Sequence, residues 1–437
     1  MSTGILTIVL FGSLIILVMT GLPLVFVMGG LAALFICILI NPAALSLISS
    51  NAIGVMNNFV LIAIPLFVFM GMVLERSGVA EDAYEMFYKW MGGLKGGLAM
   101  ATIVVCAIFA ACVGITAAAT VAMGVIALPA MLKRGYNKSI AIGSISAGGT
   151  LGILIPPSIL FIVFGVMTGE SIGKLFAAGI IPGILLAVMF FIYIGVRCYL
   201  QPNMGPAIPL EERASFKEKI SSLRMLILPL LLIAAVLGTM FAGICTPTEA
   251  AGIGALGSLI CAAVRGRLNW KLIKDSSYET LRLSCMICWL IIAGTCFSVL
   301  YNALGAQAFL KEVLSTMPVS PYVTIVGIVV ILIILGCLLD PGSIIMITTP
   351  IFVPVIVALG FDPIWFGVLF IINMEMGYLT PPFGFNLFYM KSIVPKSISM
   401  GDIYRSIFPF LLVMVACMAI IIAFPEIALW LPNQLFK

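Results

Sequence analysis

The chain has 437 residues, of which 63% are hydrophobic and only 9% are charged. Soluble domains carry about 25% charged residues, so this chain cannot cover itself with a surface that faces water. A membrane span takes about 20 apolar residues, and the length therefore allows roughly a dozen crossings of a lipid bilayer. The net charge of +5 is small and scattered, which excludes nucleic acid as a partner.

The chain has no histidine, which excludes common zinc sites and histidine acid–base catalysis. Its cysteines lie in apolar segments, and the CxxC pair Cys285 and Cys288 falls inside a predicted span, so we interpret them as small buried side chains. The segment 169–174 is one residue too short for a phosphate loop. We therefore expect no cofactor and no transition metal. Any pumping energy would have to come from an ion gradient or from another subunit.

Apolar runs long enough for membrane helices follow one another along the chain, which predicts an all-α polytopic membrane protein. The runs cover residues 4–20, 22–40, 58–75, 96–111, 117–132, 139–166, 175–196, 225–243, 247–264, 283–303, 321–338, 343–359, 363–390 and 405–424. Two segments between them, 197–224 and 265–282, are rich in Lys and Arg and are separated by two spans. Both are predicted to be cytoplasmic loops, because basic loops stay on that side.

Two of the apolar stretches are predicted to enter and leave the membrane on the same side. Residues 96–132 have basic flanks at both ends and small or polar residues at 111–116, which predicts a re-entrant hairpin from the cytoplasm. Residues 321–359 look alike, with a predicted tip at 336–343, and counting spans places the base of this hairpin on the outside. One hairpin is thus expected from each face.

An internal repeat supports this interpretation. A shift of 225 residues aligns 111–158 with 336–383 without a gap, and five of the eight identities are Gly or Pro, which fix the shape of the backbone. With opposite predicted orientations, this is an inverted repeat, a common plan of transporters. The identical pairs are Cys112/Cys337, Ile126/Ile351, Pro129/Pro354, Gly135/Gly360, Gly152/Gly377, Leu154/Leu379, Pro156/Pro381 and Pro157/Pro382.

A double proline interrupts each of the apolar runs 139–166 and 363–390. Proline has no backbone N–H and clashes with the preceding turn, so both runs are predicted to be broken helices. Carbonyls freed at such a break are tolerated in the membrane only where they are buried in protein or line a cavity. They are hard oxygen ligands suited to an alkali cation, whereas the amides of a facing tip suit an anion.

Three acidic residues are candidates for function. Asp340 lies at a predicted mid-membrane tip, where an ionisable group is costly unless it is functional or paired. Because Asp before Pro341 is also a common N-cap, both roles stay open. Glu375 either supports an ion site or is structural, and Glu249 is predicted to form a capping box with Thr246. Nothing in the sequence resembles a proton relay, so sodium is the predicted coupling ion.

Five motifs give the chain a resemblance to the large membrane subunit of tripartite ATP-independent periplasmic (TRAP) transporters, over nearly its whole length. The resemblance implies an elevator mechanism powered by sodium. It implies two partners, a small four-helix membrane subunit and a periplasmic substrate-binding protein, and a place in the bacterial inner membrane. Family substrates are mostly organic acid anions. The motifs are Leu128–Tyr136, Ala147–Ser158, Gly173–Gly183, Thr246–Ala251 and Gly377–Pro382.

The expected division of the chain follows from the resemblance together with the hairpins. Scaffold helices are expected in 1–95 and scaffold or connecting helices in 167–303. The transport domain is expected to consist of 96–166, with hairpin 96–132 and broken helix 139–166, and of 304–393, with hairpin 321–359 and broken helix 363–390. A C-terminal helix is expected in 394–437.

The resemblance also implies which residues bind ligands. One sodium site would use the first tip at Gly114 with Gly149, Thr150 and Gly152. The other would use Gly336 and Cys337 with Gly377 and Thr380. The candidate substrate contacts are Thr116, Asp340, Ser343 and Asn386.

The first tip departs from the family pattern, because it reads Val113–Thr116 where many relatives have a serine-rich tip. We therefore expect a small anion, carboxylate or sulfonate, rather than a sialic acid. The alternative function is a stand-alone divalent-anion/sodium symporter without a binding protein. An intramembrane enzyme is disfavoured by its need for clustered acids or histidines, and a passive channel by the two opposed hairpins.

Overall fold

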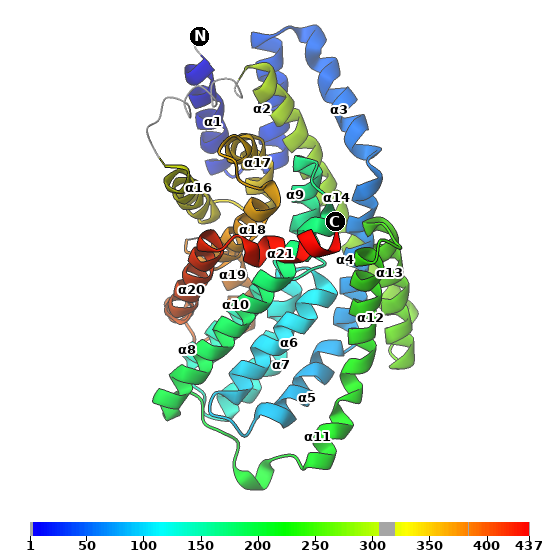
Figure 1. The fold of residues 1–437 in the computed structure, drawn as a ribbon, viewed down its shortest axis with the longest axis vertical. Helices are drawn as coiled ribbons and strands as arrows, with labels where there is room; N and C mark the ends of the chain where they lie inside the picture. The colour runs from blue at the N-terminus through cyan, green and yellow to red at the C-terminus, as the bar shows by residue number, and fades with distance from the viewer. Residues whose placement is uncertain (1–2, 306–319, 383, 437) are drawn as a thin grey trace.

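The computed structural model describes residues 3–305, 320–382 and 384–436, and its regular structure there is helical, so the predicted all-helical class is confirmed (Figure 1). In this part of the chain, eight helical stretches are long and apolar enough to cross a membrane. The helices are α1 (Thr3–Met19), α2 (Leu24–Leu39), α3 (Ser46–Met56), α4 (Ala63–Arg76), α5 (Val79–Met91), α6 (Gly97–Val113), α7 (Thr116–Lys133), α8 (Lys138–Thr150), α9 (Ile159–Thr168), α10 (Ile172–Leu200), α11 (Phe216–Ser222), α12 (Arg224–Phe241), α13 (Pro247–Val264), α14 (Trp270–Ala303), α16 (Pro321–Gly336), α17 (Pro341–Ala358), α18 (Pro363–Leu379), α19 (Phe385–Ile393), α20 (Met400–Ala423) and α21 (Glu426–Leu435).

Both predicted tips are turns between two helices. Between α6 and α7 the chain turns at Gly114, whose φ of +65° is a left-handed conformation that glycine adopts without strain. Between α16 and α17 it turns just before Asp340, which caps the N-terminus of α17. The two helices of each pair are in contact with each other. The orientation of these pairs in a membrane, and hence the inverted repeat, remains a prediction.

Both predicted breaks are present at the double prolines. Helix α8 ends at Thr150 and continues as a short 3-10 turn, Leu151–Ile153, before α9 begins at Ile159. The hydroxyl of Ser158 donates to the carbonyl of Ile153 (2.5 Å), which satisfies one of the freed acceptors. In the second half, α18 ends at Leu379 and α19 begins at Phe385.

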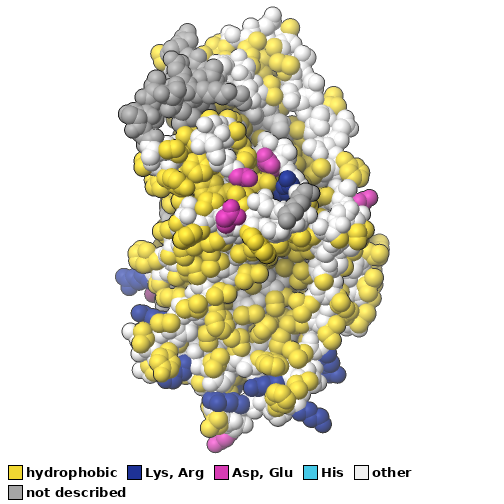
Figure 2. Space-filling model, in the orientation of Figure 1, with side chains coloured by type: hydrophobic (Ala, Val, Ile, Leu, Met, Phe, Trp, Pro, Cys, Tyr) yellow, Lys and Arg dark blue, Asp and Glu magenta, His cyan; other side chains and the backbone are white. Residues whose placement is uncertain are grey.

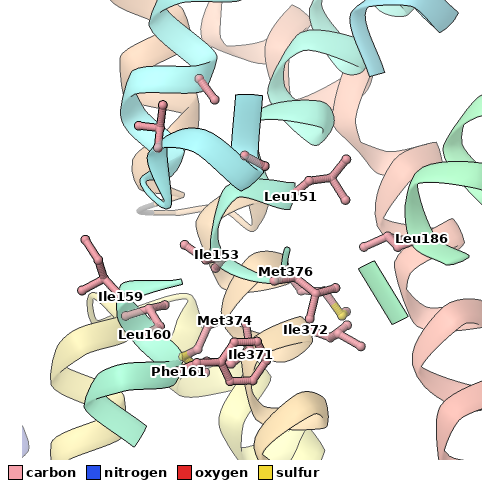
Figure 3. Close-up of a cluster of buried hydrophobic side chains, with 14 of the residues drawn as sticks. Leu151, Ile153, Ile159, Leu160, Phe161, Leu186, Ile371, Ile372, Met374 and Met376 are labelled. Carbon is pink, nitrogen blue, oxygen red and sulfur yellow. The ribbon is translucent and has the colours of Figure 1, made fainter. Parts of the chain in front are cut away.

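The two broken helices share one hydrophobic core (Figure 3). Leu151 and Ile153 come from the first break, Phe161 from α9, and Ile371 and Met374 from α18, and all five side chains are buried. Close packing of these side chains fixes the position of each break relative to the other. Helix α8 is further enclosed by α6, α7 and α20.

Several helices extend beyond or lie outside the predicted apolar runs. Residues 270–282 were predicted to belong to a basic loop, and the structure corrects this, because α14 begins at Trp270. The side chain of Asn269 accepts the backbone N–H of Leu272, which caps this polar first part of the helix. The predicted capping box of Thr246 and Glu249 at the start of α13 is confirmed.

The surface has the charge distribution of a membrane protein. Figure 2 shows a broad hydrophobic belt, with Lys and Arg side chains gathered toward the lower end of the visible face. The guanidinium of Arg134, which follows α7, donates to the hydroxyl of Tyr88 (3.0 Å) and pairs with the carboxylate of Glu212. This contact ties the base of the first helix pair to the segment after α10.

We expect the Glu212→Gln variant to have a lower Tm than the parent protein at neutral pH. The hydrogen bond from Arg134 lowers the pKa of Glu212, because it stabilises the ionised carboxylate in the folded state. The unfolded state lacks this hydrogen bond, so the ionised form favours folding. Its stabilisation is present above the unfolded pKa and is lost as the pH falls through the lower folded value. The difference should therefore shrink as the pH falls below about 4, measured by thermal unfolding in detergent. A Glu211→Gln control, which leaves the Arg134–Glu212 ion pair in place, should keep the Tm of the parent protein at neutral pH.

Candidate functional site

A cavity of about 420 Å³ lies where the two tips face helices α4 and α14. The first tip contributes Gly114, Ile115 and Thr116, and the second contributes Asp340 and Gly342. The opposite wall holds charged side chains at the end of α4 and in the first half of α14. Small-molecule sites are commonly concave, largely apolar cavities of this size with a few polar groups. The two tips, far apart in the sequence, thus border one site.

The first tip lies directly against the first break. A Cβ atom on Gly114 would come within 2.5 Å of the carbonyl oxygen of Pro157, and one on Gly149 within 1.9 Å of the Thr120 hydroxyl oxygen. A Cβ on Gly152 would lie 3.4 Å from the carbonyl of Ile115. At Gly114 and Gly149 the backbone therefore approaches a carbonyl or a hydroxyl more closely than a side chain allows, whereas a Cβ on Gly152 would make an ordinary contact.

The second tip meets the second break in the same way. A Cβ on Gly336 would lie 3.0 Å from the Cα of Gly377, so these two segments of the backbone touch through glycines. The two other predicted residues have side chains engaged within their own segments. Cys337 contacts the carbonyl of Ile333 through sulfur (3.2 Å), and the Thr380 hydroxyl donates to the carbonyl of Met376 (2.6 Å). The Thr380 hydroxyl oxygen keeps its lone pairs for a cation, and the backbone carbonyls of both residues are further oxygen donors.

Near the first break, several buried oxygen atoms have no hydrogen-bond partner among the described residues. They are the hydroxyls of Thr116, Thr120 and Ser146 and the side-chain carbonyl of Asn386. Buried polar atoms are normally satisfied, so such a group of oxygens suits a bound cation. Hard oxygen donors fit sodium, whereas the described residues hold no cluster of His, Cys, Asp and Glu for a transition metal.

The structure does not bring all the predicted substrate contacts to the cavity. Thr116 and Asp340 line it. Ser343 is fully buried and donates both its N–H (3.0 Å) and its hydroxyl to Asp340. Asn386 is also fully buried, and its amide donates to the carbonyl of Ser146 (2.8 Å), which joins α19 to α8. Thr150 is turned back on its own helix, donating to the carbonyl of Ala147 (2.8 Å).

Sequence reasoning missed the charged wall of the cavity. Glu75 and Arg76 come from the end of α4, and Glu279 comes from α14. Glu75 and Arg76 end an apolar run, and Glu279 lies in the segment that was predicted to be a loop. Thr120 and Ser146 were missed as well, although each is one helical turn from a predicted residue, Thr116 and Thr150. Glu375 does not line the cavity; it is fully buried in α18.

An all-helical chain with several membrane-long helices, and with two helix breaks facing two tips around a cavity, has the build of a multi-pass membrane transporter. The profile of the family described as "Tripartite ATP-independent periplasmic transporter, DctM component" matches residues 11–427. The chain belongs to this family, and it is therefore a transport protein and not an enzyme.

Named relatives are similar over most of the chain. The C4-dicarboxylate TRAP transporter large permease protein DctM of Pseudomonas aeruginosa is 32% identical, over 91% of this chain and 92% of the relative. The ectoine TRAP transporter large permease protein TeaC of Halomonas elongata is 32% identical, over 86% and 87%. The isethionate TRAP transporter permease protein DctMQ of Oleidesulfovibrio alaskensis is 30% identical, over 86% of this chain and 58% of the longer relative.

The fold is also found in solved structures of low sequence identity. The YdaH transporter of Alcanivorax borkumensis superposes with a TM-score of 0.64 at 15% identity, covering 94% of this chain and 97% of that one. MtrF of Neisseria gonorrhoeae superposes with a TM-score of 0.57 at 13% identity, over 89% and 84%. At these identities the likeness concerns the fold alone.

We expect Gly336→Ala to destabilise the protein by about 1–3 kcal/mol, because the added methyl group would press on the backbone of Gly377. Gly327→Ala is the matched control, since it lies on the same helix and a Cβ there meets nothing within 4 Å. The control should keep or slightly raise the Tm, because Ala is the better helix former. Equal Tm values for the two variants in detergent would contradict the close approach.

We expect Asp340→Asn to keep its cap and to lose its charge. Asn is as good an N-cap as Asp, so the variant should stay within about 0.5 kcal/mol of the parent stability, whereas Asp340→Ala should lose about 1 kcal/mol. Thermal unfolding measures both. A change in ligand affinity in Asp340→Asn without a change in Tm would separate a role in the cavity from a role as a cap.

Proposed function

We propose that the chain is the transport-catalysing large subunit of a sodium-coupled, binding-protein-dependent system. It takes up a small organic acid anion, carboxylate or sulfonate, across the bacterial inner membrane. Family membership supports a secondary transporter that depends on a binding protein. The observation that carries the proposal is the single cavity bordered by two tips, each packed against a helix break.

Sodium coupling is supported by the chemistry of the breaks. The hydroxyls of Thr116, Thr120 and Ser146 and the side-chain carbonyl of Asn386, which have no partner in the described part of the chain, are neutral oxygen donors. Such donors can hold an alkali cation without placing a carboxylate in lipid. At the second break, the contact of Gly336 with Gly377 leaves the backbone as the donor. A bound cation there would link a tip to a break in each half.

The proposed mechanism is an elevator. The first tip and first break (96–166) and the second tip and second break (304–393) form the moving transport domain, whose part at 306–319 lies outside the described residues. The helices of 1–95 and 167–303 form the scaffold, and the helices of 394–437 follow the transport domain. Substrate would be carried with the two tips past α4 and α14.

Two partners belong to this proposal, a small four-helix membrane subunit and a periplasmic substrate-binding protein. The names of the relatives give the range of acids in the family: a C4-dicarboxylate, ectoine and isethionate. Each of these molecules carries a carboxylate or a sulfonate. The small first tip, Val113–Thr116, favours a compact acid of this kind.

We expect sodium to raise the Tm of the purified chain, with its small subunit, relative to potassium or choline at equal ionic strength. A ligand that binds only the folded state adds about 2.7 kcal/mol at a hundredfold excess over Kd. Gly149→Ala should abolish the sodium-specific part, because the methyl group would displace Thr120, whereas Gly238→Ala on α12 meets no atom within 4 Å and should keep it. Equal Tm values in the three salts would contradict sodium coupling.

A further inference from the structure

The cavity between the tips has an unequal set of charges. Its lining holds three carboxylates, Glu75, Glu279 and Asp340, and one basic side chain, Arg76. Asp340 already accepts two hydrogen bonds from Ser343 as the cap of α17. The groups that remain for a ligand are therefore two glutamates and one guanidinium.

These three groups lie near one another and have no ion-pair partner within 4 Å in the described part of the chain. Glu75 is within electrostatic range of both Arg76 and Glu279. The Nη1 atom of Arg76 is buried and has no hydrogen-bond partner among the described residues. A guanidinium in this condition is ready to bind a carboxylate, which it matches in a bidentate geometry.

The side of the cavity that faces α4 and α14 offers groups suited to a cationic nitrogen and to a polar ligand atom. Tyr378 and Tyr389 line the cavity, and the face of a tyrosine ring attracts a cationic nitrogen. Thr116 is only 3% exposed, lines the cavity and has a hydroxyl without a partner among the described residues. This hydroxyl is also a proposed sodium donor, so the independent sign that a ligand completes this site is the buried Nη1 of Arg76, which has no partner among the described residues.

We propose that the substrate of this chain is a small zwitterion, with a carboxylate at one end and a cationic nitrogen at the other. This inference rests on the proposed function and specifies its organic acid further: the carboxylate of the acid is accompanied by a cationic nitrogen. The carboxylate binds Arg76, and the cationic nitrogen lies between Glu75, Glu279 and the tyrosine rings. A dicarboxylate would bring its second negative charge against the two glutamates, and the described lining holds no second basic side chain to receive it.

The test is ligand binding by the purified complex of the chain with its small subunit, in saturating sodium and without the binding protein. The probes are ectoine and glycine betaine as zwitterions, succinate as a dianion and isethionate as a monoanion, each at millimolar concentration. Thermal shift and calorimetry measure the affinities. We expect the zwitterions to bind more tightly than succinate by about tenfold or more. A change of this size in Kd corresponds to one desolvated contact between the cationic nitrogen and an aromatic ring or a carboxylate.

Variants then assign the cationic end. Glu279→Gln and, separately, Glu75→Gln should weaken zwitterion binding about tenfold and strengthen succinate binding. Arg76→Gln should weaken every probe. Asp275→Asn is the matched control, because it removes a carboxylate close to Arg76 but outside this cavity, and it should change none of the affinities. A cooperative thermal unfolding transition in each variant, in the absence of ligand, verifies that it is folded.

The outcomes separate this inference from the function beneath it. A sodium-specific shift with tight succinate binding and no zwitterion binding overturns the inference and leaves the proposed function standing. A complex that binds sodium but none of the zwitterions overturns it as well. Loss of the sodium shift in Glu279→Gln, with unchanged ligand preference, would show that the glutamates collect the coupling cation, which also overturns it. Absence of any sodium shift in the parent complex would contradict the proposed function itself.

Discussion

The structure depends on one constraint, the requirement that backbone groups freed inside a membrane be covered by protein. The two double prolines end α8 and α18 and leave carbonyls without helical partners. Each break is covered by a tip that approaches through glycine, Gly114 at Pro157 and Gly336 at Gly377. A side chain at either glycine would hold the tip away from the break. The absence of a Cβ atom thus allows each tip to cover its break at close range.

Covering the breaks also sets the position of the cavity. The amide of Asn386 donates to the carbonyl of Ser146, which joins the second broken helix to the first. The core in Figure 3 fills the space between the breaks with buried apolar side chains. The tips are therefore held on one side of a closely packed centre, and the cavity opens between them and the helices α4 and α14. The shape of the cavity follows from the backbone geometry of the tips and breaks, whereas most of its charged side chains come from α4 and α14.

The helix breaks and tips could be predicted because Gly and Pro act locally: Gly114, Pro156 and Pro381 fix backbone conformation wherever they occur. The charged wall could not be predicted, because it depends on α4 packing against α14, and Glu75 is some two hundred residues from Glu279 in the chain. The helix start at Trp270 escaped prediction because its first turns are polar. The burial of Ser343 and Asn386 likewise depends on tertiary packing, which the order of residues at a tip does not reveal.

The division of charge between the two sides of the cavity has a consequence for an elevator. Of the charged side chains that line the cavity, the tips carry only Asp340, which is already bound to Ser343, whereas Glu75, Arg76 and Glu279 belong to the proposed scaffold. If the tips move with the substrate, the charge that they add to the cavity is small, and the net charge inside the cavity is set largely by the cargo. An anion bound together with sodium has less net charge than the anion alone, and a zwitterion has none. The scaffold charges then act only where the cavity faces them, so they select the cargo without travelling with it.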